Sequence, residues 1–192
     1  MTLNESLLAE KFGIDYCNEL LFLDTSILAK IEKRCERKLR WKKYAKLNHW
    51  TCSLFERELH EKRDLPIEIK KVNTLVGFGV YATRNIPELR LIGEYTGVVR
   101  KRKRRKDSSN DYVFGYVIGP HDTPWVIDAR ERGNFTRFIN HSYQPNLTSR
   151  WIISKGVGHV IFFANRTIKK GEQLTYDYGP YYWRRRSLPQ NL

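Results

Sequence analysis

The sequence predicts an α+β protein that is helical over residues 1–66 and mainly β over the remainder. In the first part apolar residues recur every three or four positions, no proline precedes Pro66, and Gly13 is the one glycine. From Ile67 onward, short apolar runs alternate with turns rich in Gly, Pro and Asn. This second pattern is typical of an all-β core built from several small sheets.

The N-terminal segment is expected to form two or three helices. Its apolar positions at helical spacing are Leu20, Leu23, Ile27, Ile31, Cys35 and Leu39, followed by Leu47, Trp50 and Leu54. Residues 30–46 hold nine Lys or Arg against two Glu, so the second helix is expected to be strongly basic on its solvent face. Residues 1–66 show no resemblance to a known family.

The rest of the chain predicts short strands in close succession. They are expected at residues 67–72, 79–82, 91–95, 98–100, 112–118, 125–128, 147–153, 160–164 and 173–176. One short helix is expected over residues 133–139, and no internal repeat is visible.

The net charge of +14 is concentrated in a few places. Besides residues 30–46, residues 100–106 form the unbroken run Arg-Lys-Arg-Lys-Arg-Arg-Lys, and residues 184–186 add three Arg. Local basic patches indicate a polyanionic partner, with nucleic acid ahead of a membrane surface, and DNA contact is expected through runs 30–46 and 100–106. A solvated face that favours solubility explains each run equally well. The run 100–106 also has the pattern of a nuclear-import signal.

Several classes of protein are disfavoured. The sequence has three cysteines, Cys17, Cys35 and Cys52, and they are widely spaced. An odd number at such spacings argues against a disulfide framework or a structural metal site. It fits free thiols in a reducing compartment. The longest apolar stretch, residues 20–31, is interrupted by Asp24 and Lys30, so no membrane span or secretory signal is expected.

Four motifs carry the chemistry. Residues 77–80 read Gly-Phe-Gly-Val, and residues 93–97 read Gly-Glu-Tyr-Thr-Gly. Residues 137–142 read Arg-Phe-Ile-Asn-His-Ser, and residues 171–179 read Gly-Glu-Gln-Leu-Thr-Tyr-Asp-Tyr-Gly. In this order and at these spacings, the chain from about residue 67 to 183 resembles the SET domain of protein lysine methyltransferases.

The resemblance implies a fold and a domain organisation. The fold would be the SET arrangement of several small sheets with a C-terminal pseudoknot, which brings Asn140, His141 and Tyr178 together. The helical basic segment 1–66 would precede a catalytic domain at 67–183, and a basic tail would follow at 184–192. The activity implied is transfer of a methyl group from S-adenosylmethionine to a lysine of a protein.

The cofactor site follows from the same resemblance. A Gly-x-Gly loop lets the backbone approach a small ligand closely, and the Asn-His pair would hold the amino group and adenine of S-adenosylmethionine. Trp183 would pack over the cofactor. The residues expected at the cofactor are Gly77, Phe78, Gly79, Arg137, Phe138, Asn140, His141 and Trp183.

Three tyrosines are expected at the reaction centre. Methyl transfer is an in-line displacement that needs alignment rather than a covalent intermediate, and Tyr178 is expected to organise it through contacts to the methyl group. Tyr112 and Tyr176 would line the lysine channel, where aromatic walls stabilise a cationic head. Tyr176 stands where the family carries Phe or Tyr, and a hydroxyl there leaves less room for added methyl groups, so the resemblance implies mono- or dimethylation.

The chain departs from many histone methyltransferases because it lacks cysteine-rich zinc clusters. Tyr143 stands where a Cys is common, and no Cys follows Cys52. Residues 181–183 are therefore expected to close the lysine channel in place of a zinc cluster. The short size and basic helical start resemble the SET proteins of chlamydia-type intracellular bacteria, which implies a bacterial effector that acts in the bacterial cytoplasm or, after secretion, on chromatin in the host nucleus.

Three questions stay open at this level. The substrate is expected to be a histone or a histone-like protein, with a non-histone protein as the alternative. A catalytically inactive SET fold that binds chromatin or nucleic acid is the rival from a different class. The N-terminal helices could also make a homodimer.

Overall fold

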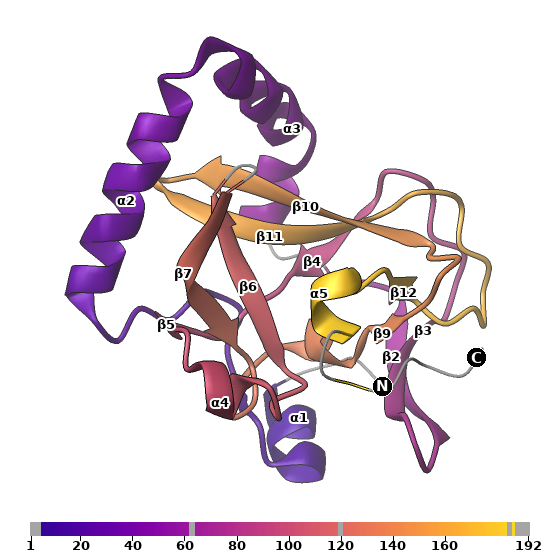
Figure 1. Cartoon of the computed structure of the whole chain (residues 1–192). Helices are drawn as coiled ribbons and strands as arrows, with labels where there is room; N and C mark the ends of the chain where they lie inside the picture. Colours follow the sequence, from indigo (N-terminus) through magenta and orange to yellow (C-terminus); the bar gives the residue numbers. More distant parts are fainter. Residues whose placement is uncertain (1–4, 62–63, 119–120, 184–185, 187–192) are drawn as a thin grey trace.

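The structure is a computed structural model that describes residues 5–61, 64–118, 121–183 and 186 (Figure 1). The N-terminal part contains α1 (Glu5–Phe12), α2 (Thr25–Leu39) and α3 (Lys42–Glu61), which confirms the expected helices. In Figure 1, α2 and α3 form an arm along one side of a body of small sheets.

The burial of α2 follows its sequence pattern. Asp24 caps the helix by accepting a hydrogen bond from the Ser26 amide at 2.9 Å. Ile27, Ile31 and Cys35, spaced four residues apart, are buried against the body. Leu23 precedes the helix and is exposed, so the apolar spacing begins before the helix does.

The buried face of α3 differs from the apolar stripe in its sequence. Leu47, Trp50 and Leu54 are exposed, whereas Asn48, Thr51, Phe55 and Leu59 are buried. The reason is a pair of hydrogen bonds to strand β10: the Asn48 amide donates to the Ile153 carbonyl at 2.9 Å and accepts from the Ile153 N–H at 2.7 Å. Asn48 thereby satisfies backbone groups at the free edge of a sheet, which water would otherwise have to solvate.

The described strands form small sheets, as expected. Their bounds are β1 Asp15–Tyr16, β2 Ile67–Asn73, β3 Gly77–Ala82, β4 Leu91–Glu94, β5 Val98–Lys101, β6 Val113–Ile118, β7 His121–Asp128, β8 Arg132–Gly133, β9 Asn140–His141, β10 Leu147–Ser154, β11 Val157–Ala164 and β12 Thr175–Tyr176. The sheet orders are β2-β3, β10-β11-β4, β5-β7-β6, β9-β12 and β1-β8. All the expected strands are confirmed, while the two-residue strands β1, β8 and β9 were not expected.

Short helical turns complete the fold. The 3-10 turn η1 (Phe135–Phe138) confirms the expected short helix, and α4 (Arg104–Asp107) and α5 (Pro180–Trp183) were not expected. The basic tail 184–192 lies outside the described residues except for Arg186.

The pairing of β9 with β12 creates the site. These strands run parallel, with Thr175 opposite Asn140 and Tyr176 opposite His141. The hairpin β10–β11 separates them in sequence, yet the pairing sets the motif at 137–142 beside the motif at 171–179 (Figure 1). Asn140, His141 and Tyr178 come together as the resemblance implied.

Residues 8–21 are packed into the same body. Leu8 is fully buried, β1 pairs in parallel with β8, and the Leu21 N–H donates to the Gly97 carbonyl at 2.9 Å. The Val99 N–H donates in turn to the Leu21 carbonyl at 2.8 Å. The N-terminal segment therefore supports the strands on either side of the Gly-Glu-Tyr-Thr-Gly motif.

Candidate active site

The loop at Gly77–Gly79 is held closely by its neighbours. Gly77 has φ of +79°, a conformation that favours glycine. A Cβ on Gly79 would collide with the Gln173 side chain and lie 3.0 Å from Asn140 Nδ2. Asn140 Nδ2 also donates to the Phe78 carbonyl at 2.9 Å. The loop and the Asn-His motif thus share a tight interface in which only glycine fits at position 79.

His141 presents an unused hydrogen-bond donor. Its Nδ1 accepts from the Tyr178 backbone N–H at 3.2 Å, and Asp177 Oδ1 lies 3.6 Å from the same atom. Burial lowers the pKa of His141 below its usual value and outweighs the opposing effect of Asp177, so the ring is neutral at neutral pH. A neutral ring that accepts at Nδ1 carries its proton on Nε2, and Nε2 is buried without a partner.

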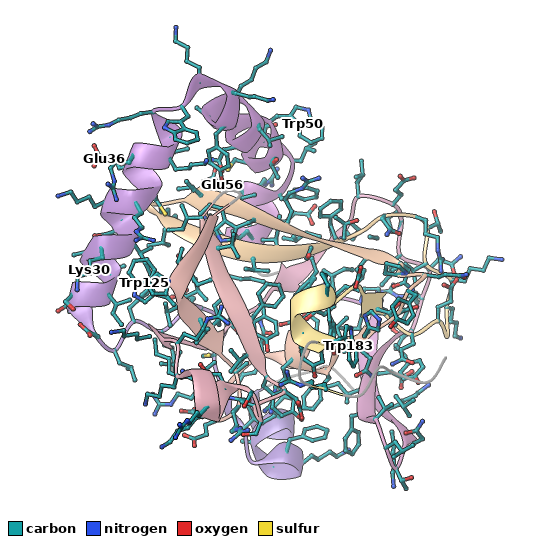
Figure 2. All side chains as sticks on the ribbon, viewed as in Figure 1. Lys30, Glu36, Trp50, Glu56, Trp125 and Trp183 are labelled. Atoms are coloured by element: carbon teal, nitrogen blue, oxygen red, sulfur yellow. The ribbon has the colours of Figure 1, made fainter. Side chains whose placement is uncertain are left out.

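Two further side-chain donors of the expected cofactor residues are buried without a partner. They are Arg137 Nε, three residues before Asn140, and the indole Nε1 of Trp183. The ring of Trp183, the last residue of α5 (labelled in Figure 2), lies 5.0 Å from the His141 ring and 6.1 Å from the Tyr178 ring. Buried donors without partners are rare in proteins, so this group fits a ligand that brings several acceptors.

A cluster of tyrosines in tilted and edge-to-face contact forms the centre of the site. The Tyr178 ring lies 4.7 Å from the Tyr176 ring and 4.6 Å from the Tyr182 ring. The Tyr178 hydroxyl donates to the Ile139 carbonyl at 2.9 Å, which leaves its lone pairs available to accept. Burial raises the pKa of both Tyr176 and Tyr178 well above the usual value of a phenol. Both are therefore neutral at neutral pH, and neither can act as a proton acceptor in its ionised form.

A cavity of about 540 Å³ opens at these tyrosines. Tyr95, Phe114 and Tyr176 line its aromatic part, and the side of strand β6 extends it. Asp107 and Asp111 line it as well, but both already have cationic partners. Arg100 binds Asp107 at 2.6 Å, and Arg186 binds Asp111 at 3.0 Å.

The structure brings together most of the residues expected from sequence. Asn140, His141, Tyr176, Tyr178 and Trp183 contact one another directly or through one neighbour. The ring centroids of Phe78, which is exposed, and Phe138, which is buried, are 6.4 Å apart.

Tyr112 is placed differently from the expectation. The guanidinium of Arg137 lies 3.6 Å above its ring, and the cavity is lined by Asp111 and Val113 on either side of Tyr112 but not by Tyr112 itself. Burial lowers the pKa of Arg137, and the nearby phenols oppose that effect. The assignment of Tyr112 to the lysine channel stays a prediction.

Sequence reasoning missed three residues. Tyr95, in the Gly-Glu-Tyr-Thr-Gly motif, lines the cavity, and its hydroxyl donates to the Tyr112 carbonyl at 2.9 Å. Arg186 was counted with the basic tail, but it also donates to the Asn110 carbonyl at 3.0 Å and so fastens the chain after α5 to the cavity rim. Phe12 of α1 lies 4.8 Å from the rings of both Phe78 and Phe138. No local sequence pattern marks the last two contacts.

Within the described ranges, no group of three or more His, Cys, Asp or Glu side chains is placed to hold a metal ion. None of the described helices combines the length and the apolar character needed to cross a membrane.

Comparison with known proteins identifies the class. Residues 77–179 match the model of the SET domain family, and this chain belongs to that family. It is 41% identical over 106 residues to histone-lysine N-methyltransferase 2B of Homo sapiens, an alignment that covers 53% of this chain and 4% of that protein. It is 38% identical over 111 residues to histone-lysine N-methyltransferase set-2 of Caenorhabditis elegans, covering 53% of this chain and 7% of that protein. The chain thus spans less than a tenth of the length of these relatives.

Solved structures give the same result. SUVH6 of Arabidopsis thaliana in complex with SAM superposes with a TM-score of 0.55 and 31% identity, over 65% of this chain and 30% of that chain. KRYPTONITE in complex with mCHH DNA, an H3(1-15) peptide and SAH superposes with a TM-score of 0.51 and 33% identity, over 62% of this chain and 24% of that chain.

Proposed function

We propose that this protein transfers a methyl group from S-adenosylmethionine to a lysine of a histone or histone-like protein. The observation that carries the proposal is that His141 and Trp183, whose ring N–H donors are buried without a partner, pack next to Tyr178, a neutral tyrosine that lines the cavity. The names of the relatives, histone-lysine N-methyltransferases, support the reaction, and the SAM, SAH and H3 peptide in the titles of the solved structures support the ligands.

The residues on the loop side fit S-adenosylmethionine. Backbone groups at Gly77 and Gly79 can approach the amino acid part of the cofactor, because neither residue has a side chain in the way. His141 Nε2 and Trp183 Nε1 are donors for its carboxylate and ring nitrogens. Arg137, which lines the tyrosine cavity, stays a predicted cofactor residue. When bound, the cofactor supplies an electrophilic methyl group on a sulfonium.

The tyrosines orient the acceptor lysine. Tyr178, whose hydroxyl is fixed on the Ile139 carbonyl, offers its oxygen lone pairs for C–H···O contacts that align the attacking nitrogen. The lysine must first lose a proton, which at neutral pH and a pKa of about 10.4 costs roughly 4 kcal/mol. Burial among Tyr95, Phe114 and Tyr176 lowers that cost by disfavouring the charged form. Because Tyr178 is neutral and its pKa is raised, water is the proton acceptor.

The degree of methylation belongs to the same proposal. The buried Tyr176 ring stands 4.7 Å from both Phe162 and Tyr178, and its hydroxyl occupies space that further methyl groups would need. We therefore expect mono- or dimethylation by the wild type. Tyr176→Phe is expected to shift the product toward trimethyl-lysine, as read from the mass of the product peptide, and an unchanged product distribution would contradict this role.

The substrate class, the oligomeric state and the cellular location stay predictions from sequence. A non-histone substrate, a homodimer, and a bacterial origin with action in the bacterial cytoplasm or the host nucleus are expectations from sequence. Contact with DNA through the basic runs is likewise an expectation from sequence. A catalytically inactive SET fold is the rival, and it predicts that no methyl group is transferred.

The test is transfer of labelled methyl from S-adenosylmethionine to three acceptors: core histones, linker histones and a protein without lysine. We expect label on histone lysine and none on the lysine-free protein. Label on neither histone class, with cofactor binding intact, would contradict the histone part of the proposal. Absence of cofactor binding would favour the inactive fold.

A further inference from the structure

The cations of the α2–α3 arm fall into two groups. Arg40 pairs with Glu36 at 2.6 Å, and the buried Lys38 places its ammonium 3.9 Å from the centre of the Trp41 ring. Other cations here are exposed and make no ion pair with the described residues. They are Lys30, Lys33, Arg37, Lys42, Lys43 and Lys46.

Three of these free cations lie on one stripe of α2. At about 100° of rotation per residue, Lys30, Lys33 and Arg37 fall within roughly 60° of one another. Arg34 lies between this stripe and the buried face that Ile31 marks. The two Glu of the helix lie beyond the Lys33 side of this stripe, Glu36 by about 60° and Glu32 by about 100°, and Glu36 is paired with Arg40 at 2.6 Å.

Arg34 joins the stripe to the second basic run. Its guanidinium lies 4.9 Å above the Trp125 ring, and Figure 2 shows Trp125 between α2 and β7. Trp125 is the partner of Lys101 in the antiparallel pair β5–β7. Directly opposed residues project from the same face of a sheet, so exposed Lys101 lies on the α2 side of the body. Runs 30–46 and 100–106 therefore meet at Trp125.

Because successive side chains of a strand project from opposite faces, Arg100 does not lie on the α2 side with Lys101. Arg100 projects from the other face of β5, where it binds Asp107 at 2.6 Å and Asp128 at 2.7 Å. It is a structural cation, while its neighbour Lys101 is free. The unbroken basic run in the sequence is thus divided by the fold into a structural part and an exposed part.

We propose that Lys30, Lys33, Arg37 and Lys101, the basic face, bind the phosphate backbone of duplex nucleic acid. A duplex presents one negative charge per about 1.7 Å of its axis, and the stripe from Lys30 to Arg37 extends about 10 Å along α2. Unpaired cations on a rigid helix match this array without first breaking an ion pair. The exposed Lys42, Lys43 and Lys46, which follow α2 in the sequence, add charge next to it.

This binding is separate from methyl transfer, because none of the four residues lines the cavity. The test measures binding of the full chain to a labelled DNA duplex of about 20 base pairs over about 50 to 200 mM salt. A matched duplex RNA and vesicles of phosphatidylcholine with phosphatidylserine are run in parallel. The wild type is expected to bind duplex with a steep dependence on salt.

The test variant is Lys30→Gln/Lys33→Gln/Arg37→Gln. Its control is Arg84→Gln/Lys169→Gln/Lys170→Gln, which removes the same residue types from three exposed positions near the Ile86–Ile168 bridge. The test variant is expected to bind duplex at least about tenfold more weakly and to lower the salt slope by about 2 to 3, with a much smaller change in the control. Lys101→Gln is expected to lower the same slope by about one.

Several results would overturn the proposal. Equal losses in the test variant and its control would show that net charge alone drives binding. No duplex binding by the wild type, or binding to vesicles alone, would reject a nucleic-acid face. Comparable affinity for DNA and RNA supports a backbone contact common to both, and a clear preference for one identifies which nucleic acid is the partner. Since the readout is binding, a failure here leaves the methyl-transfer test unaffected.

Discussion

The cavity and the α2–α3 arm use cations in opposite ways. At the cavity, Arg137 is stacked on Tyr112 and Arg186 is paired with Asp111. On the arm, Lys30, Lys33 and Arg37 face solvent without ion pairs among the described residues. Groups at a reaction centre must be desolvated and fixed, whereas groups that meet a polyanion must stay accessible. The SET motifs mark the first kind of site, and only the charge distribution marks the second.

The largest effect on function is expected from a substitution in the cofactor loop at Gly77–Gly79. Gly79→Ala places a Cβ against the side chains of Gln173 and Asn140. Asn140, which donates a hydrogen bond to the Phe78 carbonyl, must then move. We expect the affinity for S-adenosylmethionine, measured by calorimetry, to fall by at least about 100-fold. Gly115→Ala is the control, because its Cβ would meet only the flexible end of Arg102 at 3.3 Å. Unchanged binding in Gly79→Ala would remove the loop from the cofactor site.

An intermediate effect is expected where the N-terminal segment contacts this loop. Phe12→Ala removes the ring that packs on Phe78 and Phe138, and we expect about 3 kcal/mol of lost stability. If Phe12 positions the loop, the KM for S-adenosylmethionine rises about tenfold while kcat changes little.

Phe55→Ala is the control that separates a positioning effect of Phe12 on the cofactor loop from a general loss of folding stability. Phe55 is buried and stacks on Phe163 at 4.7 Å in a different cluster. It is expected to lose comparable stability, measured by urea unfolding, with an unchanged KM. Phe12→Leu is expected to restore most of the cofactor affinity. Parallel changes of KM in Phe12→Ala and Phe55→Ala would reduce Phe12 to a packing role.

The smallest effect is expected from pH at the junction of the arm and the body. Burial alone would lower the pKa of His159, but the hydrogen bond and charge of Glu94, 2.7 Å away, outweigh it and raise that pKa. A raised pKa adds stability below the unfolded value of about 6.5, and this stability is lost as pH rises through the folded value. His60, whose pKa is lowered by burial, acts in the opposite direction.

Unfolding in urea at a series of pH values tests this pair. The difference in stability between wild type and His159→Gln is expected to shrink as pH rises from about 6 to 8. Since His60 is present in both proteins, its contribution cancels and the difference reports on His159. If the stability difference between wild type and His159→Gln grew with pH, the His159–Glu94 pair would not hold a proton in the folded state.

The fold was largely predictable because its elements have local signals. The strand expected at residues 147–153 is β10, Leu147–Ser154, and the helix around Ile31 is α2. The two-residue strands β1, β8 and β9 are too short to produce any periodicity. The buried face of α3 was not predictable, because it depends on the hydrogen bonds between Asn48 and Ile153, which are 105 residues apart.

The site residues that belong to the sequence motifs were predictable. Asn140, His141 and Tyr178 come together through the β9–β12 pairing, as the resemblance implied. The pair of Arg186 with Asp111 joins residues 75 positions apart, and the contact of Phe12 with Phe78 depends on the packing of α1. Tertiary contacts of this kind leave no pattern in one sequence.

The central claim is that Tyr178 organises methyl transfer and does not merely support the fold. The most direct measurement compares wild type with Tyr178→Phe for cofactor affinity and for methyl transfer at saturating S-adenosylmethionine. Tyr143→Phe is the control, because Tyr143 is exposed and the change keeps its ring contact with His141. We expect the affinity of Tyr178→Phe for the cofactor to stay near that of the wild type while methyl transfer falls by about 100-fold or more. Transfer at the wild-type rate in Tyr178→Phe, or equal losses of affinity and transfer, would contradict it.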